Sequence, residues 1–235
     1  MSVKLISVFA AVAIASASNA ALVYGGGTET GSRFNPGGSV ITYMNCFTAI
    51  DGTAAQTQLA LDSAIVGIRR IAAAAALTDV GIKIYAAEMT YDGTNFGRGA
   101  NYEIYSSASL GGGAASVTQL VNTGAVSGVT LNLETVSNAA AGLGGFWLGV
   151  EFTGANAANV ANGWRVVNTP TTGASINGFG MFNYQASGAF QAFYNLGAAA
   201  PSRFMVDVNG TLVPAPGALA LLGVAGLAGA RRRRS

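Results

Sequence analysis

The chain has 235 residues, which is enough for one domain with a sizeable core or for two small ones. Charged residues make up only 9% of it while glycine contributes 33 residues, a composition typical of an extracellular β protein with many tight turns. Without Lys4 and the four terminal arginines the body carries seven basic and ten acidic residues, a net charge of −3, which excludes attraction to nucleic acid.

The first twenty residues have the three parts of a cleavable secretory signal peptide. Lys4 supplies the positive charge, Leu5 to Ala15 form the apolar segment, and Ser18-Asn19-Ala20 is a small-x-small cleavage site. We expect cleavage after Ala20, so residues 1–20 are absent from the mature protein.

The segment that follows is rich in turn residues before the first predicted strand begins. Glycine clusters make residues 21–38 turn-like, and alternating side chains then predict a strand over 39–46. Residues 53–78 are rich in alanine and nearly free of glycine, which is compatible with a helix. Alternation around Leu59 and Leu61 and the β-branched run from Ile65 favour two strands instead, over about 57–62 and 65–72.

The remainder of the body shows clear period-two alternation, in which apolar residues recur at every second position. Predicted strands cover residues 80–88, 101–106, 129–136, 146–152, 164–168, 178–184, 189–195 and 203–208, and residues 209–212 are expected to form a linker. Short strands separated by Gly, Asn and Ser turns predict an all-β protein, an antiparallel β-sandwich of jelly-roll type. We assign this sandwich to a single extracytoplasmic domain, residues 21–212.

The side chains of the usual catalytic machinery are missing from this body. The chain has no histidine and only one cysteine, Cys46, which excludes Ser-His and Cys-His catalysis and argues against a zinc site. The clusters Gly25–Gly27 and Gly111–Gly113 lack the lysine and spacing of a phosphate loop, and Asp92–Asn95 is expected to be a plain turn rather than a calcium site. We therefore expect no enzymatic activity and no cofactor. Four carboxylates on predicted strands are the only acid–base candidates, and we expect them to be solvated charges on an outer face: Glu103, Glu134, Glu151 and Asp207.

Three aromatic residues are candidates for contact with a glycan, because exposed aromatic faces offer flat apolar area to sugar rings. Trp147 and Tyr85 fall on the polar phase of their strands, and Trp164 opens a strand. The alternative is that both tryptophans are covered by the second sheet or by a loop. Cys46 has no partner for an intrachain disulfide, so we expect a small buried side chain, with an intermolecular bridge as the alternative.

The last twenty-three residues have an organisation of their own. Val213, Pro214, Ala215 and Pro216 are expected to be extended, because the two prolines fix φ and remove two backbone donors. An apolar segment from Gly217 to Ala230 follows, and four arginines close the chain: Arg231, Arg232, Arg233 and Arg234. Counted from Val213, the apolar part would span roughly 27 Å as a helix, just enough for a short transmembrane helix whose arginines stay in the cytoplasm.

This tail resembles the PEP-CTERM sorting signal of Gram-negative bacteria, with alanine at position 215 where that family's motif has glutamate. The resemblance is confined to residues 213–235. It implies export through the secretion translocon, removal of the leader by signal peptidase, and transient anchoring in the inner membrane. It also implies processing by exosortase, a membrane cysteine transpeptidase, and an association with exopolysaccharide. An ordinary C-terminal membrane anchor is the alternative.

Sequence and resemblance together predict an exported, non-catalytic protein of the cell surface or extracellular matrix, associated with exopolysaccharide or biofilm. The alternative is a carbohydrate-binding module that contacts the exopolysaccharide through Trp147, Trp164 or Tyr85.

Overall fold

A computed structural model gives the fold of the body between the expected signal peptide and the expected sorting tail. It describes residues 21–27, 29–34, 41–48, 56–70, 80–91, 96–110, 118–135, 144–154, 162–167, 171, 174–175, 180–185, 190–195 and 203–214. The expected signal peptide, the tail from Ala215 onward and the turn Asp92–Asn95 lie outside these residues. Within this part of the chain all regular structure is β, and no helix is long and apolar enough to cross a membrane.

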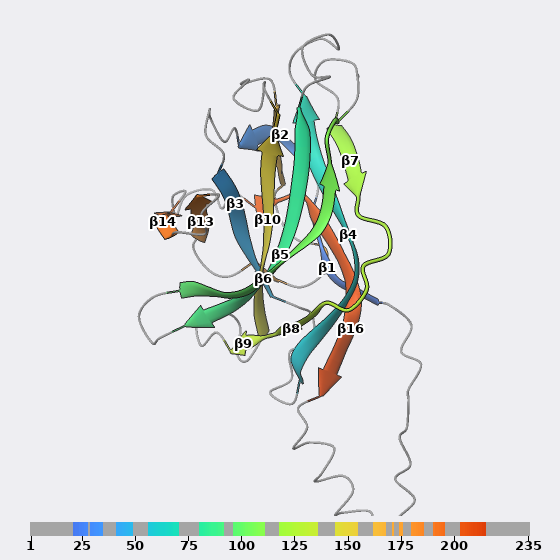
Figure 1. Ribbon diagram of the computed structural model, residues 1–235, viewed down its shortest axis with the longest axis vertical. Coiled ribbons are helices and arrows are strands. Elements are labelled where there is room, and N and C mark those ends of the chain that lie inside the picture. Colours follow the sequence, from blue (N-terminus) through green and yellow to red (C-terminus); the bar gives the residue numbers. More distant parts are fainter. Residues whose placement is uncertain are drawn as a thin grey trace, which may run out of the picture.

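The strands form two antiparallel sheets (Figure 1). Sheet A contains β1 (Ala21–Gly25), β2 (Glu29–Phe34), β4 (Gln56–Arg70), β7 (Thr118–Asn122), β8 (Thr130–Asn132), β11 (Asn162–Val167), β15 (Arg203–Phe204) and β16 (Val206–Pro214). Sheet B contains β3 (Ile41–Thr48), β5 (Gly81–Tyr91), β6 (Phe96–Ser107), β9 (Glu134–Thr135), β10 (Gly144–Thr153), β12 (Ala174–Ser175), β13 (Gly180–Gln185) and β14 (Phe190–Asn195).

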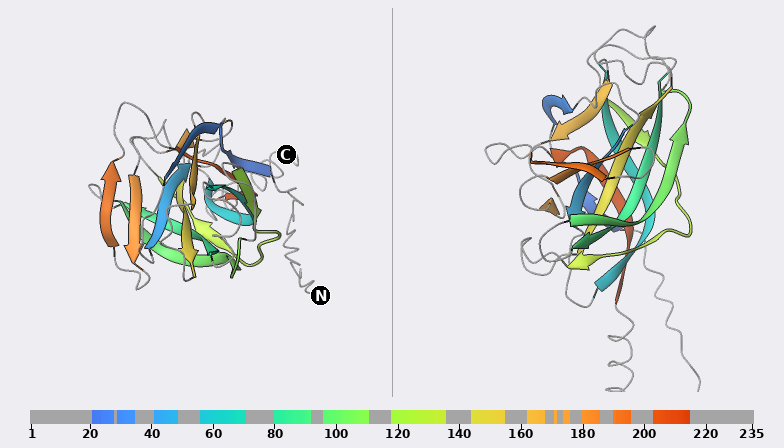
Figure 2. Two further views of the ribbon diagram at one scale, coloured as in Figure 1. Left: turned by 90° about the horizontal axis from the view of Figure 1, so that it is seen from above. Right: turned by 60° about the vertical axis from the view of Figure 1, so that its left-hand side comes forward.

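Strand order shows how the chain moves between the sheets. Sheet A runs β1-β16-β4-β11-β15, with β7 and β8 also paired to β4, and sheet B runs β14-β13-β3-β10-β5-β6. The strands form nested antiparallel pairs: consecutive β5 and β6 pair with each other, and around them strands more distant in sequence pair as β4 with β7, β3 with β10 and β1 with β16. Strands β13 and β14, in orange, lie at one border of sheet B (Figure 2).

Buried apolar residues from both sheets form one core cluster. Sheet A contributes Leu59, Val66 and Ile68, which are fully buried, and sheet B contributes fully buried Ile82 and Ile84 among others. Val66 and Ile68, like Ile82 and Ile84, are two positions apart, as expected when one face of a strand is apolar. Burying this face is the main driving force that holds the sheets together.

Strand β4 corrects the expectation for residues 57–72. It is one strand of 15 residues, not two and not a helix. Its buried positions shift from odd (Leu59, Leu61) to even (Ala64, Val66, Ile68), and its register with β16 is irregular at the same place. This is a β-bulge at residues 62–63, which moves the apolar residues from one parity to the other. The chain between β7 and β8 supports it, since Val126 N donates to the Asp62 carbonyl at 2.7 Å.

Residues 129–136, predicted as one strand, form two short strands in different sheets. β8 pairs with β4 in sheet A, while β9 pairs with β10 in sheet B. The chain crosses between the sheets at Leu133, which is buried like Leu131. Alternation continues across the crossing, which is why the sequence pattern did not reveal it.

Several strands were not expected. β1 and β2 lie in the segment predicted as turns, and β7 lies between two glycine-containing stretches. The predicted strand 203–208 is interrupted at Met205, and β16 then continues to Pro214, so the expectation of a linker over residues 209–212 is wrong. Backbone pairing with β4 extends from Val206 to the end of this strand.

Candidate functional site

Both tryptophans considered for glycan contact are buried, which agrees with the alternative that they are covered and removes them as glycan contacts. Trp164 on β11 lies in the core, with its ring stacked on Phe204 at 4.3 Å between centroids. Its indole Nε1 donates to the Met205 carbonyl at 3.3 Å. Trp147 lies on the opposite face of β10 from the core residues, as predicted, yet it is only 1% exposed. Neither ring offers accessible area to a sugar.

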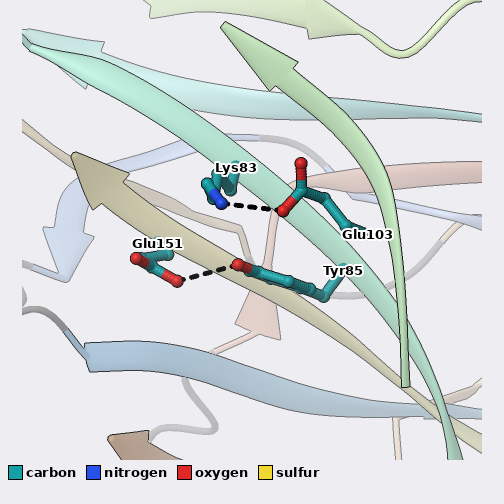
Figure 3. A network of polar contacts seen from close by, with 4 residues as sticks. All are labelled: Lys83, Tyr85, Glu103 and Glu151. Carbon is teal, nitrogen blue, oxygen red and sulfur yellow. Dashed lines mark hydrogen bonds and ion pairs between the residues drawn. The ribbon is translucent and has the colours of Figure 1, made fainter. Parts of the chain in front are cut away.

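Tyr85, the third aromatic candidate, lies on the outer face of sheet B and remains partly exposed. Its neighbours along β5, Ile84 and Ala86, are fully buried toward the core, so alternation directs Tyr85 outward together with Lys83. Pairing adds two glutamates from the adjacent strands, Glu103 of β6 and Glu151 of β10. We call these four residues the Tyr85 patch: Lys83, Tyr85, Glu103 and Glu151 (Figure 3).

The contacts within the patch run diagonally between strands. Tyr85 OH donates a hydrogen bond to Glu151 Oε2 at 3.0 Å, although the residue directly opposite Tyr85 on β10 is Gly149. A glycine there leaves the ring free to lie across β10 and reach the next outward position, a distance that aromatic side chains can span. Lys83 Nζ lies 2.8 Å from Glu103 Oε2 on the other side of β5. The side chains of this ion pair are 35% and 40% exposed.

Glu151 is the buried member of the patch, at 7% exposed. The sequence predicted a solvated charge on the outer face; the outward position is confirmed, but the solvation is not. A buried carboxylate requires hydrogen-bond donors to offset its loss of hydration, and the Tyr85 hydroxyl supplies one. Glu103 is exposed, as expected.

The pKa values of the two donors are shifted in the same direction. Burial, with smaller contributions from the hydrogen bond to Glu151 and that carboxylate's charge, raises the pKa of Tyr85 above its ordinary value of 10.0. The hydrogen bond to Glu103 and its negative charge raise the pKa of Lys83 above 10.5. At neutral pH the patch therefore presents a neutral phenol and a charged ammonium, each next to a carboxylate.

The other two candidate carboxylates lie elsewhere. Asp207 of β16 is in sheet A, where its Oδ1 accepts a hydrogen bond from Gly26 N at 2.9 Å. Glu134 lies on β9, and its side chain is outside the described residues, as is that of Cys46 on β3. Among the described residues, no group of three or more His, Cys, Asp or Glu side chains is arranged to hold a metal ion.

The Tyr85 patch presents hydrogen-bonding groups of several kinds on the outer face of sheet B. Carboxylate oxygens accept, while the ammonium and the phenol donate, a mixture that suits a ligand with many hydroxyl groups. Sequence reasoning named Tyr85 but not its partnership with Lys83 and Glu151. Alternation along the sequence predicted that all three side chains point outward, but it did not predict that β5 pairs with β10.

Of the sorting-signal residues, the structure describes Val213 and Pro214, the last two residues of β16. Residues 215–216 and Arg231–Arg234 lie outside it. Comparisons with protein-family models, with curated proteins and with solved structures gave no match. The function of this two-sheet protein is therefore argued from its own residues.

Proposed function

We propose that the chain is an exported, non-catalytic protein of the cell surface or extracellular matrix, sorted by an exosortase-type system and associated with exopolysaccharide. The observation that carries the proposal is the tail, in which Pro214-Ala215-Pro216 precedes an apolar segment and four arginines. The tail holds the protein briefly in the inner membrane with Arg231–Arg234 in the cytoplasm. Exosortase then processes it near the prolines.

The positions of the two terminal strands support this route. β1 begins at Ala21, the first residue after the expected signal-peptidase site, and β16 ends at Pro214. The two strands pair, with Ala21 opposite Gly210. The described strands from Ala21 to Pro214 thus begin and end on a neighbouring pair, to which both proposed targeting segments are attached. A domain with adjacent ends can fold as a unit between two membrane-directed segments.

We further propose that the body is a jelly-roll sandwich. The four nested pairs support this: β1–β16, β3–β10, β4–β7 and β5–β6. They are the pairs obtained when one long antiparallel hairpin is folded over into two sheets, so that the sheets read β1-β16-β4-β7 and β3-β10-β5-β6. Strands β11 to β15 then form an insertion between β10 and β16. Such folds are frequent in surface and carbohydrate-binding proteins.

Membrane fractionation tests the role of the tail. In a Gram-negative host without an exosortase system, we expect the full chain to sediment with the inner membrane. A chain that ends at Pro214 should be soluble in the periplasm. Adding the producer's processing system should cleave the tail and release the body from the membrane. A full chain that is soluble without that system would contradict the proposal.

A second function, binding of the exopolysaccharide, is favoured by the Tyr85 patch. Tyr85 is partly exposed whereas both tryptophans are buried, and the patch combines donors and acceptors for sugar hydroxyls.

A charge-removing variant tests this binding. Glu103→Gln removes a charged acceptor without touching the core, and it should weaken retention on the producer's polysaccharide. Thr130→Gln, at an exposed position of β8 in sheet A, is a control on the other sheet. Equal retention of both variants and the wild type would leave the matrix-protein proposal standing alone.

A further inference from the structure

The last strand of the body overlaps the processing segment. β16 pairs with β4 as far as its final residues, with Leu212 opposite Leu59, Val213 opposite Gln58 and Pro214 opposite Gln56. Val213 and Pro214 therefore belong to sheet A and not to a free linker. A proline is tolerated here because it ends the strand, and the register is irregular between Val213 and Pro214.

The part of β4 that holds this strand end is itself fixed on its other side. Gln58 and Leu59 pair with Asn132 and Leu131 of β8, so β16, β4 and β8 form a three-stranded unit at this end of the sheet. Gln58 Nε2 also donates to Asn132 Oδ1 at 3.0 Å. Asn132 in turn donates to Glu88 Oε1 of sheet B, through its backbone N at 3.0 Å and its Nδ2 at 2.6 Å. Pulling the end of β16 away from β4 would disturb this connected unit.

The middle of β16 is held more firmly than its end. Residues 207–210 pair with β1 on one side and with β4 on the other, and Val206 and Val208 are fully buried. Gly210 approaches β4 so closely that an added Cβ would lie 2.6 Å from the Ala60 carbonyl oxygen. Among the described strands, residues 211–214 pair with β4 alone. Access to the backbone should therefore decrease steadily from Pro214 toward Val206.

We infer that β16 sets the upstream limit of C-terminal processing, so that the cleaved peptide bond lies after Pro214. This inference rests on the proposed function. A processing enzyme needs its substrate as an unpaired, extended segment, and the peptide groups before Pro214 are occupied by β4. In the reaction the carbonyl carbon of the cleaved bond passes to water or to an acceptor amine, and the tail leaves with a new amino group. The mature body keeps β16 complete, and with it the pairing with β1.

Limited proteolysis of the purified full chain tests this limit without any processing enzyme. With a protease of broad specificity, we expect the resistant fragment to end at Pro214 or beyond it. A resistant fragment that ends within residues 206–213 would overturn the inference. Gly210→Ala should increase cleavage within β16 by about tenfold, because the new methyl group forces the strand away from Ala60 and cleavage follows the population of the open form. Thr211→Ser is the matched control and should cleave like the wild type.

The C-terminal residue of the processed protein, determined by mass spectrometry, provides a second test. A mature chain from the producing cell that ends at Pro214 or later supports the inference, and one that ends within residues 206–213 contradicts it while leaving the proposed processing intact. A chain that retains Ser235 contradicts the proposed processing instead, and the proteolysis result then decides the strand limit alone.

Discussion

At the scale of single residues, the position of the Tyr85 ring depends on Gly149 of the neighbouring strand β10. Because Gly149 stands directly opposite Tyr85, the phenol ring lies across β10 and its hydroxyl reaches the buried carboxylate of Glu151. A side chain at position 149 would occupy the space over which the ring extends. The outward phase of Tyr85 was predicted from alternation. The burial of Glu151 and Trp147 was not, because burial depends on segments that the local pattern does not identify.

Tyr85→Phe tests this hydrogen bond. Removing a donor from a buried carboxylate should lower the free energy of unfolding at pH 7 by about 1–3 kcal/mol, measured by chemical denaturation. Tyr102→Phe, on the neighbouring strand β6, is the matched control and should change stability less.

The same hydrogen bond predicts a pH dependence. The folded-state pKa of Tyr85 is raised above its ordinary 10.0, so the contribution of Tyr85 to the free energy of unfolding is present below pH 10.0 and is lost at higher pH. The difference between wild type and Tyr85→Phe should therefore shrink above pH 10.0. A difference that grows there would contradict the assigned direction.

At the scale of strands, Glu88 joins the two sheets through its carboxylate. Glu88 of β5 accepts hydrogen bonds from Asn132 of β8 and, at 3.4 Å, from the backbone N of Ala100 on β6.

Sequence patterns predicted β5, β10, β13 and β14, because apolar and polar residues alternate along each of these strands. They missed the bulge in β4, because its change of parity was taken as a break between two strands. They also missed the crossing between β8 and β9, because the alternation of apolar residues continues when the chain changes sheet. They missed β1 and β2 because neighbouring glycines dominate that composition.

Glu88→Ala tests the connection between the sheets. The loss of a charged acceptor from three N–H groups should cost about 1–2 kcal/mol of unfolding free energy, measured by urea denaturation. Glu103→Ala is a matched control on the next strand, because it removes an exposed ion pair with Lys83, worth about 0–1 kcal/mol. An equal cost for the two variants would show that the carboxylate of Glu88 does not hold β5 and β8 together.

At the scale of the whole molecule, the ends of the body are part of its fold. β1 begins at Ala21, β16 ends at Pro214, and the two pair with each other. The sequence analysis ended the body at residue 212, because it took residues 209–212 as a linker to the proline pair. In the sheet, Gly210 permits a close approach of β16 to Ala60 of β4.

Circular dichroism tests this architecture. The isolated body, residues 21–214, should give a far-ultraviolet circular dichroism spectrum typical of β structure and one cooperative unfolding transition. A spectrum dominated by helix would contradict the architecture.

The intact mass of the protein purified from the producing cell's exterior tests most directly whether the chain is exported and processed at its tail. We expect a single mature chain that begins at Ala21 and has lost Arg231–Arg234, with its last residue at Pro214 or shortly after it. A chain that is found outside the cell and still extends to Ser235 would contradict the proposed processing.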